Sequence, residues 1–161
     1  MFHIQDETYN NYGPDYQASS KYPDPLVYNW SVSVPMGYID QVPHTYSYTL
    51  GLYGIQNEKQ LTIGESTTGA KLLAMPPTKG GSALLKLETL TELAMERCDS
   101  ARCALQLMGD LAVKYGFYGT DGVLEQAGEA LTVADTKEVW YVCLDDSQMY
   151  SCILFVVAFS H

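Results

Sequence analysis

Apolar residues recur at helical spacing in the middle of the chain. Between residues 82 and 116, leucine and alanine return every three or four positions, which is the period of one helix face. Ser82 is a candidate N-cap for a first helix, and Asp99 or Ser100 for a second. Gly116 supplies a left-handed residue that ends the second helix. The recurring residues are Leu84, Leu87, Leu90, Leu93 and Ala94, then Ala101, Ala104, Leu105, Met108, Leu111 and Ala112.

Strand patterns flank this helical segment on both sides. Before it, residues 45–54 and 59–64 combine aromatic and β-branched residues with alternation. After it, residues 129–135 and 139–144 are typical of a hairpin, and the last ten residues, CILFVVAFSH, favour a buried strand. Each amphipathic helix must bury its apolar face, and a sheet is the natural partner. The pattern therefore predicts an α+β fold.

Composition and charge narrow the class of protein. The 161 residues include 9 Lys+Arg and 19 Asp+Glu, for a net charge of −10, and 47% are hydrophobic. This is enough chain for one domain with a real core. The acidic balance argues against nucleic acid and anionic membranes as partners, since both attract basic surfaces. The N-terminus, MFHIQDETYN, shows no signal peptide, so a cytoplasmic location is the default expectation.

The cysteines and histidines offer no obvious chemistry. We expect the four cysteines to be reduced and mostly structural, because they are too few for a disulfide scaffold. Cys98 and Cys103 would point about 140° apart on a continuous helix, so they are not expected to act as a ligand pair. No metal site and no cofactor is predicted. His44 is better explained as a loop or strand-end histidine than as a catalytic base.

One polar segment has two possible interpretations. Residues 65–81 are predicted to form a loop, and the segment from Gly64 to Gly69 crowds hydroxyls and a carboxylate between two glycines. It is either a hydrogen-bonded turn or a pocket loop that holds a small polar ligand. Glu129 and Asp135, at the two ends of a predicted strand, are expected to be solvent-facing edge residues.

Several strings, in order, resemble one enzyme family. Residues 42–48 (VPHTYSY) precede residues 55–71 (IQNEKQLTIGESTTGAK), which resemble the central motif of the dipeptidase A and secernin-like cysteine peptidases. The helical segment from LAMERC to the YGFYG at residues 115–119 is similar to the family's helices. GEALTVAD and EVW at residues 128–140 resemble the hairpin that follows. The resemblance runs from about residue 22 to residue 140.

The resemblance implies a fold and a mechanism. The family is similar to the N-terminal-nucleophile hydrolases, with a four-layer αββα fold. In these enzymes a leading cysteine attacks the peptide carbonyl while its own α-amine accepts the thiol proton, and no cofactor is needed. Asn57 matches the oxyanion-stabilising asparagine, although an Asx turn before a strand explains it equally well. Glu65, Ser66 and Thr67 are the candidate substrate-binding residues, and dipeptides or short peptides are the expected partners.

The chain also departs from the family pattern. It has no cysteine before Cys98, which has no free α-amine, and residues 141–161 diverge. We therefore expect residues 1–161 to form a single partial domain, incomplete at both ends, that lacks the nucleophile and is inactive. The alternative is a non-catalytic peptide-binding or interaction module that retains the pocket loop. A homo-oligomer is possible on either interpretation.

Overall fold

A computed structural model describes residues 2–4, 36–69, 74–77, 80–119, 127–144 and 152–158. The predictions for residues 22–35 lie outside the described residues, and so do parts of the predicted loop at 65–81. The described part contains two helices, α1 (Leu87–Arg97) and α2 (Ala101–Tyr115). Its strands are β1 (Phe2–Ile4), β2 (Gly37–Ile39), β3 (Tyr48–Leu50), β4 (Gly54–Asn57), β5 (Thr62–Gly69), β6 (Leu85–Lys86), β7 (Phe117–Tyr118), β8 (Ala127–Ala134), β9 (Glu138–Leu144) and β10 (Cys152–Ala158).

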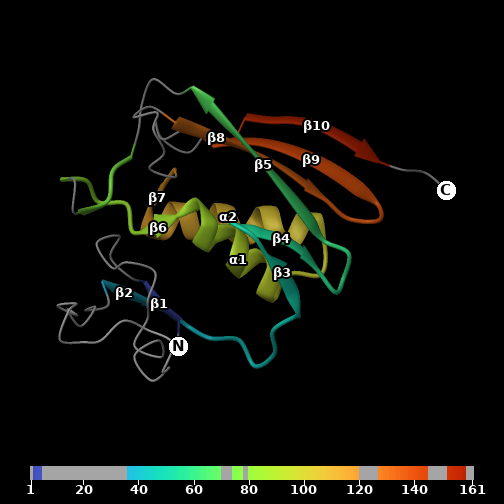
Figure 1. Ribbon diagram of the computed structural model, residues 1–161, viewed down its shortest axis with the longest axis horizontal. Helices are drawn as coiled ribbons and strands as arrows, with labels where there is room; N and C mark the ends of the chain where they lie inside the picture. The colour runs from blue at the N-terminus through green and yellow to red at the C-terminus, as the bar shows by residue number, and fades with distance from the viewer. Residues whose placement is uncertain are drawn as a thin grey trace, which may run out of the picture.

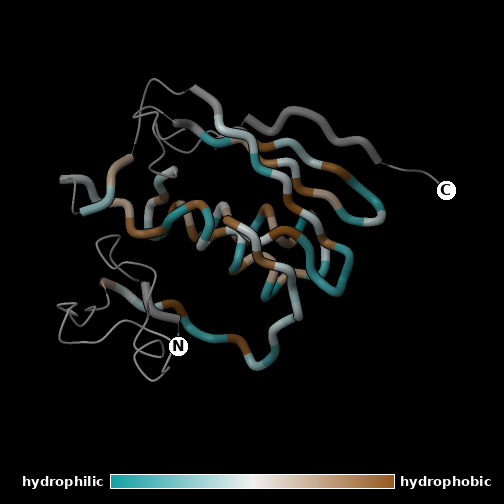
Figure 2. The backbone as a smooth tube through the Cα atoms, in the orientation of Figure 1, coloured by the Kyte–Doolittle hydropathy of each residue, from teal (hydrophilic) through white to brown (hydrophobic). Residues whose placement is uncertain are grey.

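The main sheet is antiparallel and has the strand order β10-β9-β8-β5-β4-β3. Both helices lie on one face of this sheet (Figure 1). The α+β class is therefore confirmed. The predicted hairpin is also confirmed, since β8 and β9 pair along their length around a turn at Asp135. The turns that join β4 to β5 and β8 to β9 are hydrophilic (Figure 2).

Two strand predictions need correction. Residues 45–54 were expected to form one strand, but the chain turns back at residues 51–53 and makes the β3–β4 hairpin. Residues 65–69 were expected to be in a loop, but they continue β5 and pair with β8 from Thr62 to Gly69. Polar residues are compatible with a strand when a neighbouring strand satisfies their backbone groups.

The first helix begins later than the sequence pattern predicts. Ser82 is not its N-cap, because the chain stays extended as far as Lys86 and β6 pairs in parallel with β7. The Leu84 N–H donates to the Tyr115 carbonyl, which ties this extended segment to the end of α2. Gly116 ends α2 with a φ of 69°, as expected. A Cβ there would also lie 2.9 Å from Ala83 Cα.

The core lies between the helices and the sheet, as expected from the two apolar helix faces. Alternate residues of β5, β8 and β9 point into it, because side chains in a strand alternate between the two faces of a sheet. Fully buried residues of this layer are Leu61, Ile63, Leu87, Leu90, Leu93, Ala94, Met95, Leu131 and Val133.

Gly54 allows β4 to approach α1 closely. An added Cβ would lie 2.7 Å from Met95 Cγ and 2.9 Å from the Thr91 carbonyl oxygen. The Gly54 N–H also donates to Thr91 Oγ1 at 3.0 Å. We expect Gly54→Ala to lower the free energy of unfolding by about 1–3 kcal/mol, because the helix would have to shift. Urea denaturation measures this change.

Gly64→Ala is the matched control. A Cβ at Gly64, which also lies within a strand, would meet only Thr132 Cβ, at 4.0 Å. Little loss of stability is expected there. Equal losses at the two glycines would contradict the close packing of β4 on α1.

Candidate functional site

Glu65 and Thr67 lie on the face of β5 that is turned toward the helices. They alternate with Gly64 and Ser66, and they follow Ile63, which is buried in the core. The Thr67 hydroxyl donates to Glu65 Oε1 at 3.1 Å. Glu65 is half-buried and Thr67 is exposed, so this pair extends the core face into a polar, accessible region.

Ser66 does not join this pair. Strand alternation puts it with Gly64 on the opposite face of the sheet, where both are exposed. The structure therefore brings together two of the three predicted substrate-binding residues and separates the third. Residues 64–69 form neither a turn nor a pocket loop, so neither interpretation of the local structure holds. A continuous strand imposes this two-faced arrangement.

Glu129 is a residue that the sequence analysis misjudged. It was expected at a solvent-facing edge, but it is only 2% exposed and lies opposite Thr67 in the β5–β8 register. Directly opposite residues share a face, so Glu129 joins Glu65 and Thr67 on the helix side. The alternation of side chains along a strand could have revealed this burial, because Glu129 lies two and four residues before the buried Leu131 and Val133 and therefore shares their face.

The edge of β5 beside Glu65 and Thr67 has no strand partner within the described part of the chain. β4 pairs with β5 at Gln56 and Thr62, and from Ile63 onward the pairing described is with β8 on the other side. On the open side the Glu65 N–H donates to the Tyr53 hydroxyl at 3.2 Å. An extended peptide can add itself to such an edge, where it would replace Tyr53 as the partner of the Glu65 N–H.

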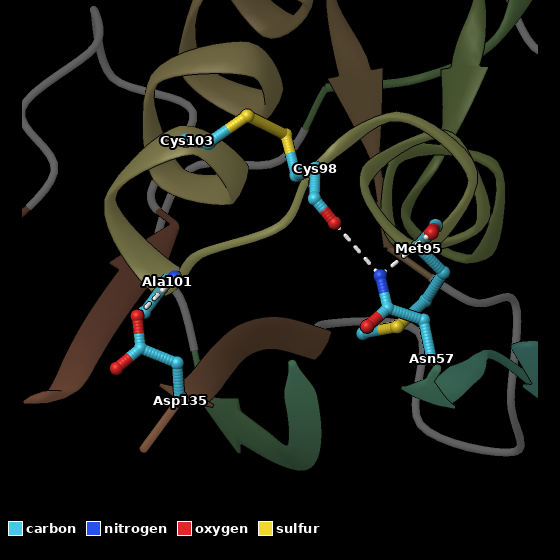
Figure 3. Close-up of a disulfide and its surroundings, with 6 residues drawn as sticks. All are labelled: Asn57, Met95, Cys98, Ala101, Cys103 and Asp135. Atoms are coloured by element: carbon cyan, nitrogen blue, oxygen red, sulfur yellow. Dashed lines mark hydrogen bonds between the residues drawn. A yellow bond between two sulfur atoms is a disulfide. The ribbon is translucent and has the colours of Figure 1, made fainter. Parts of the chain in front are cut away.

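Asn57 has a fully engaged side chain. It is 4% exposed, and its Nδ2 donates to the carbonyls of Met95 at 2.9 Å and Cys98 at 2.7 Å (Figure 3). Its Oδ1 accepts from the N–H groups of Lys59 and Leu61. Both amide hydrogens are in use, so neither is left for an oxyanion. This geometry supports the Asx turn and does not support the oxyanion role.

Cys98 and Cys103 form a disulfide, contrary to the expectation of reduced thiols (Figure 3). The helical-spacing argument was wrong because no continuous helix connects them. α1 ends at Arg97, the backbone is extended at Cys98 and Ser100, and Cys103 lies in the first turn of α2. The two α-carbons are therefore only 5.4 Å apart. Cys98 is 1% exposed.

Asp135, also expected to face solvent only, anchors the start of α2. Its Oδ2 accepts from the Ala101 N–H at 2.8 Å, while the Ser100 side chain makes no capping hydrogen bond. Its Oδ1 accepts from the N–H groups of Lys137 and Glu138. Partial burial raises the pKa of this carboxyl, but these backbone hydrogen bonds outweigh burial and lower it overall. The β8–β9 turn is thereby fixed to the helix junction.

An acidic stripe on α1 faces β3. Glu88, Glu92 and Glu96 are spaced four residues apart, so they lie on one side of the helix. Burial raises the pKa of Glu92, and the neighbouring Glu96 and Glu88 raise it further. Burial, followed by Glu92 and Glu96, raises the pKa of Tyr48 to about 12. The carboxyl of Glu92 and the hydroxyl of Tyr48 therefore hold their protons to a higher pH than these groups ordinarily do.

Other candidate groups are dispersed. His44 lies exposed in the loop before β3, with its ring edge-on to Tyr46 at a centroid distance of 5.4 Å. Across the described ranges, three or more His, Cys, Asp or Glu side chains do not gather where they could hold a metal ion. The described helices are too short or too polar to cross a bilayer.

Comparison with known families supports the sequence resemblance. The model of peptidase family C69 matches residues 49–145, which is more than half of the chain and includes β5, both helices and the β8–β9 hairpin. The chain belongs to peptidase family C69. The resemblance of residues 22–48 lies outside this match and stays a prediction. No solved structure matches the chain.

The role of Asn57 can be tested by an isosteric change. Asn57→Asp replaces two donated hydrogen bonds with a buried carboxyl that faces the carbonyls of Met95 and Cys98. We expect the free energy of unfolding to fall by about 3 kcal/mol or more. Gln56→Glu makes the same chemical change at an exposed neighbour and is expected to cost less than about 0.5 kcal/mol. Similar losses in urea denaturation would contradict the assignment.

The raised pKa of Glu92 predicts a pH-dependent stability. The pKa of Glu92 is higher in the folded state than its ordinary value of 4.5. The free energy of unfolding therefore falls as the pH rises from 4.5 through the folded-state pKa. Glu92→Gln should therefore raise the melting temperature at pH 7 and change it much less at pH 4. Asp110→Asn, on the exposed face of α2, removes the same charge and serves as the control. Equal shifts for both variants at pH 7 would contradict the prediction.

Proposed function

We propose that this domain binds short peptides along the edge of β5 and that the family's chemistry at this site is cysteine-type dipeptide hydrolysis. Membership of a peptidase family supports a peptidase-type function and peptide substrates. The observation that carries the proposal is the polar face formed by Glu65, Thr67 and Glu129, beside an open strand edge. The family match includes all three residues.

This face suits the amino end of a peptide. A short peptide carries a free ammonium group, which pairs best with carboxylates in a partly desolvated setting. The half-buried Glu65 supplies the carboxylate that the ammonium group contacts, and the buried Glu129, opposite Thr67, adds a second negative charge nearby. The peptide backbone would extend along β5, donating to and accepting from its open edge. In this arrangement Ser66, on the other face, does not contact the peptide, and Asn57 acts at a distance by fixing the β4–β5 turn.

The nucleophile of such a reaction is a thiolate with a base nearby. Cys98 and Cys103 are bonded to each other, so neither offers a thiolate at the helix junction. The resemblance implies a leading cysteine whose own amine acts as the base, and the sequence has no cysteine before Cys98. We therefore propose that the 161-residue polypeptide by itself binds peptides without cleaving them. The alternative function, a non-catalytic binding module, also requires binding without cleavage.

The proposal includes the four-layer αββα architecture of the N-terminal-nucleophile hydrolases. In the described part of the structure one helical layer covers one face of the main sheet. The opposite face presents Gly64, Ser66, Thr132 and Tyr141, all of which are exposed. A second sheet would pack on this face at about 10 Å. Gly64, Ser66 and Thr132 are small, which allows such an approach over β5 and β8.

Calorimetric titration with a panel of dipeptides tests the binding site. We expect Glu65→Gln and Glu129→Gln each to weaken dipeptide binding by about tenfold or more, because each removes a charge that the ammonium needs. Ser66→Ala, on the opposite face, should bind as the original chain does. An N-acetylated dipeptide, which lacks the ammonium, should bind poorly to all forms. Equal affinity of both glutamine variants and the original chain would overturn the site.

Hydrolysis is tested separately on the same panel. We compare the 161-residue chain with a form extended at its N-terminus to begin at a cysteine. Turnover by the extended form alone supports the leading-cysteine mechanism, while turnover by the 161-residue chain refutes its proposed inactivity. Binding without turnover by either form favours the non-catalytic module.

A further inference from the structure

Two cysteines outside the helix junction lie opposite each other in the main sheet. β9 and β10 are antiparallel neighbours, and their register pairs Cys143 with Cys152. The two residues are separated by eight others along the chain, yet they occupy the same position on adjacent strands. Neither residue is used by the proposed peptide site on β5 and β8.

Strand geometry puts such a pair within bonding range. The α-carbons of directly opposite residues in antiparallel strands are about 4.5 or 5.5 Å apart, depending on the type of pair. Disulfides form across α-carbon separations of about 4.4–6.8 Å. The Cys98–Cys103 pair, at 5.4 Å, shows that this chain uses a separation of this size for a disulfide.

The Cys98–Cys103 bond leaves Cys143 and Cys152 as the two remaining cysteines. Four cysteines allow three sets of two bonds, and the bond between Cys98 and Cys103 leaves one partner each for Cys143 and Cys152. We propose that Cys143 and Cys152 form a second, reversible disulfide, which fastens β10 covalently to the main sheet.

The reaction is a thiol–disulfide exchange with a low-molecular-weight disulfide such as oxidised glutathione. One cysteine thiolate attacks a sulfur of the oxidant, whose other half leaves as a thiolate and takes up a proton. The second cysteine then attacks the mixed disulfide and expels the remaining half as a thiol. The protein pair loses two electrons and two protons, and the oxidant becomes two thiols.

The bond would stabilise a strand at one end of the sheet. β10 stands at the end of the strand order, and among the described strands it pairs with β9 alone. Its register also shifts between Leu154 and Val156. A covalent link at Cys152 fixes the register on one side of this irregularity, because a slip of one residue would separate the two sulfurs. The bond also keeps β10 paired with β9, so the edge of β9 is not available to another chain.

Peptide mapping of the original chain tests the bond. The protein is incubated with oxidised glutathione, blocked with N-ethylmaleimide, and digested with trypsin and cyanogen bromide without reduction. Trypsin separates Cys98 from Cys103 after Arg102, and cyanogen bromide separates Cys143 from Cys152 after Met149. We expect fragments 138–149 and 150–161 to be linked, and to separate after treatment with dithiothreitol.

Three results would overturn the proposal. They are N-ethylmaleimide on both Cys143 and Cys152, a link from either of them to Cys98 or Cys103, and a dimer joined through them in a non-reducing gel. The fragment that holds Cys98 and the one that holds Cys103 should be linked in every oxidised sample, which is the internal control for the digestion.

Hydrogen exchange tests the attachment of β10. In the Cys143→Ser/Cys152→Ser double variant, which keeps the other disulfide, the amides of β10 should exchange at least about tenfold faster than in the oxidised chain. The amides of α1 and α2 serve as the internal reference. Unchanged exchange in β10 would refute the fastening role even if the bond itself is found.

Discussion

The side-chain amide of Asn57 joins the two layers of this domain. It holds the β4–β5 turn through two backbone N–H groups and the α1–α2 junction through two carbonyls, and three of these four contacts are buried. Only a neutral amide can donate and accept in this way, so the residue type is fixed by geometry. β5 begins directly after this turn, and its position relative to the helices follows from these contacts.

The helix junction has two further attachments. The disulfide between Cys98 and Cys103 crosses the extended residues between α1 and α2, and Asp135 accepts the first N–H of α2. Sheet and helices are thus linked at both the β4–β5 and the β8–β9 turns. Between these anchors β5 and β8 run side by side, and their far ends carry Glu65, Thr67 and Glu129. The proposed peptide site therefore lies on the two strands whose other ends are attached to the helix junction.

The errors in the sequence predictions share a physical cause. Ser82 was a reasonable N-cap by local pattern, but parallel pairing of β6 with β7 kept the chain extended beyond it. Residues 65–69 have turn-like composition, but pairing with β8 made them a strand. Cys98 and Cys103 were judged by helical spacing, which did not apply once the helix was interrupted. In the first two cases a contact with a distant part of the chain outweighed the local preference, and in the third the break between α1 and α2 brought two nearby residues together.

The sequence by itself determined the α+β class, the two amphipathic helices, the β8–β9 hairpin and the peptidase family, because periodicity, turn residues and motif order are properties of short segments. Only the tertiary structure decided that Glu129 is buried, that Ser66 faces away from Glu65, and that Asn57 has no free amide hydrogen. Those outcomes depend on strand register and on contacts between residues nearly forty positions apart, which local patterns do not encode.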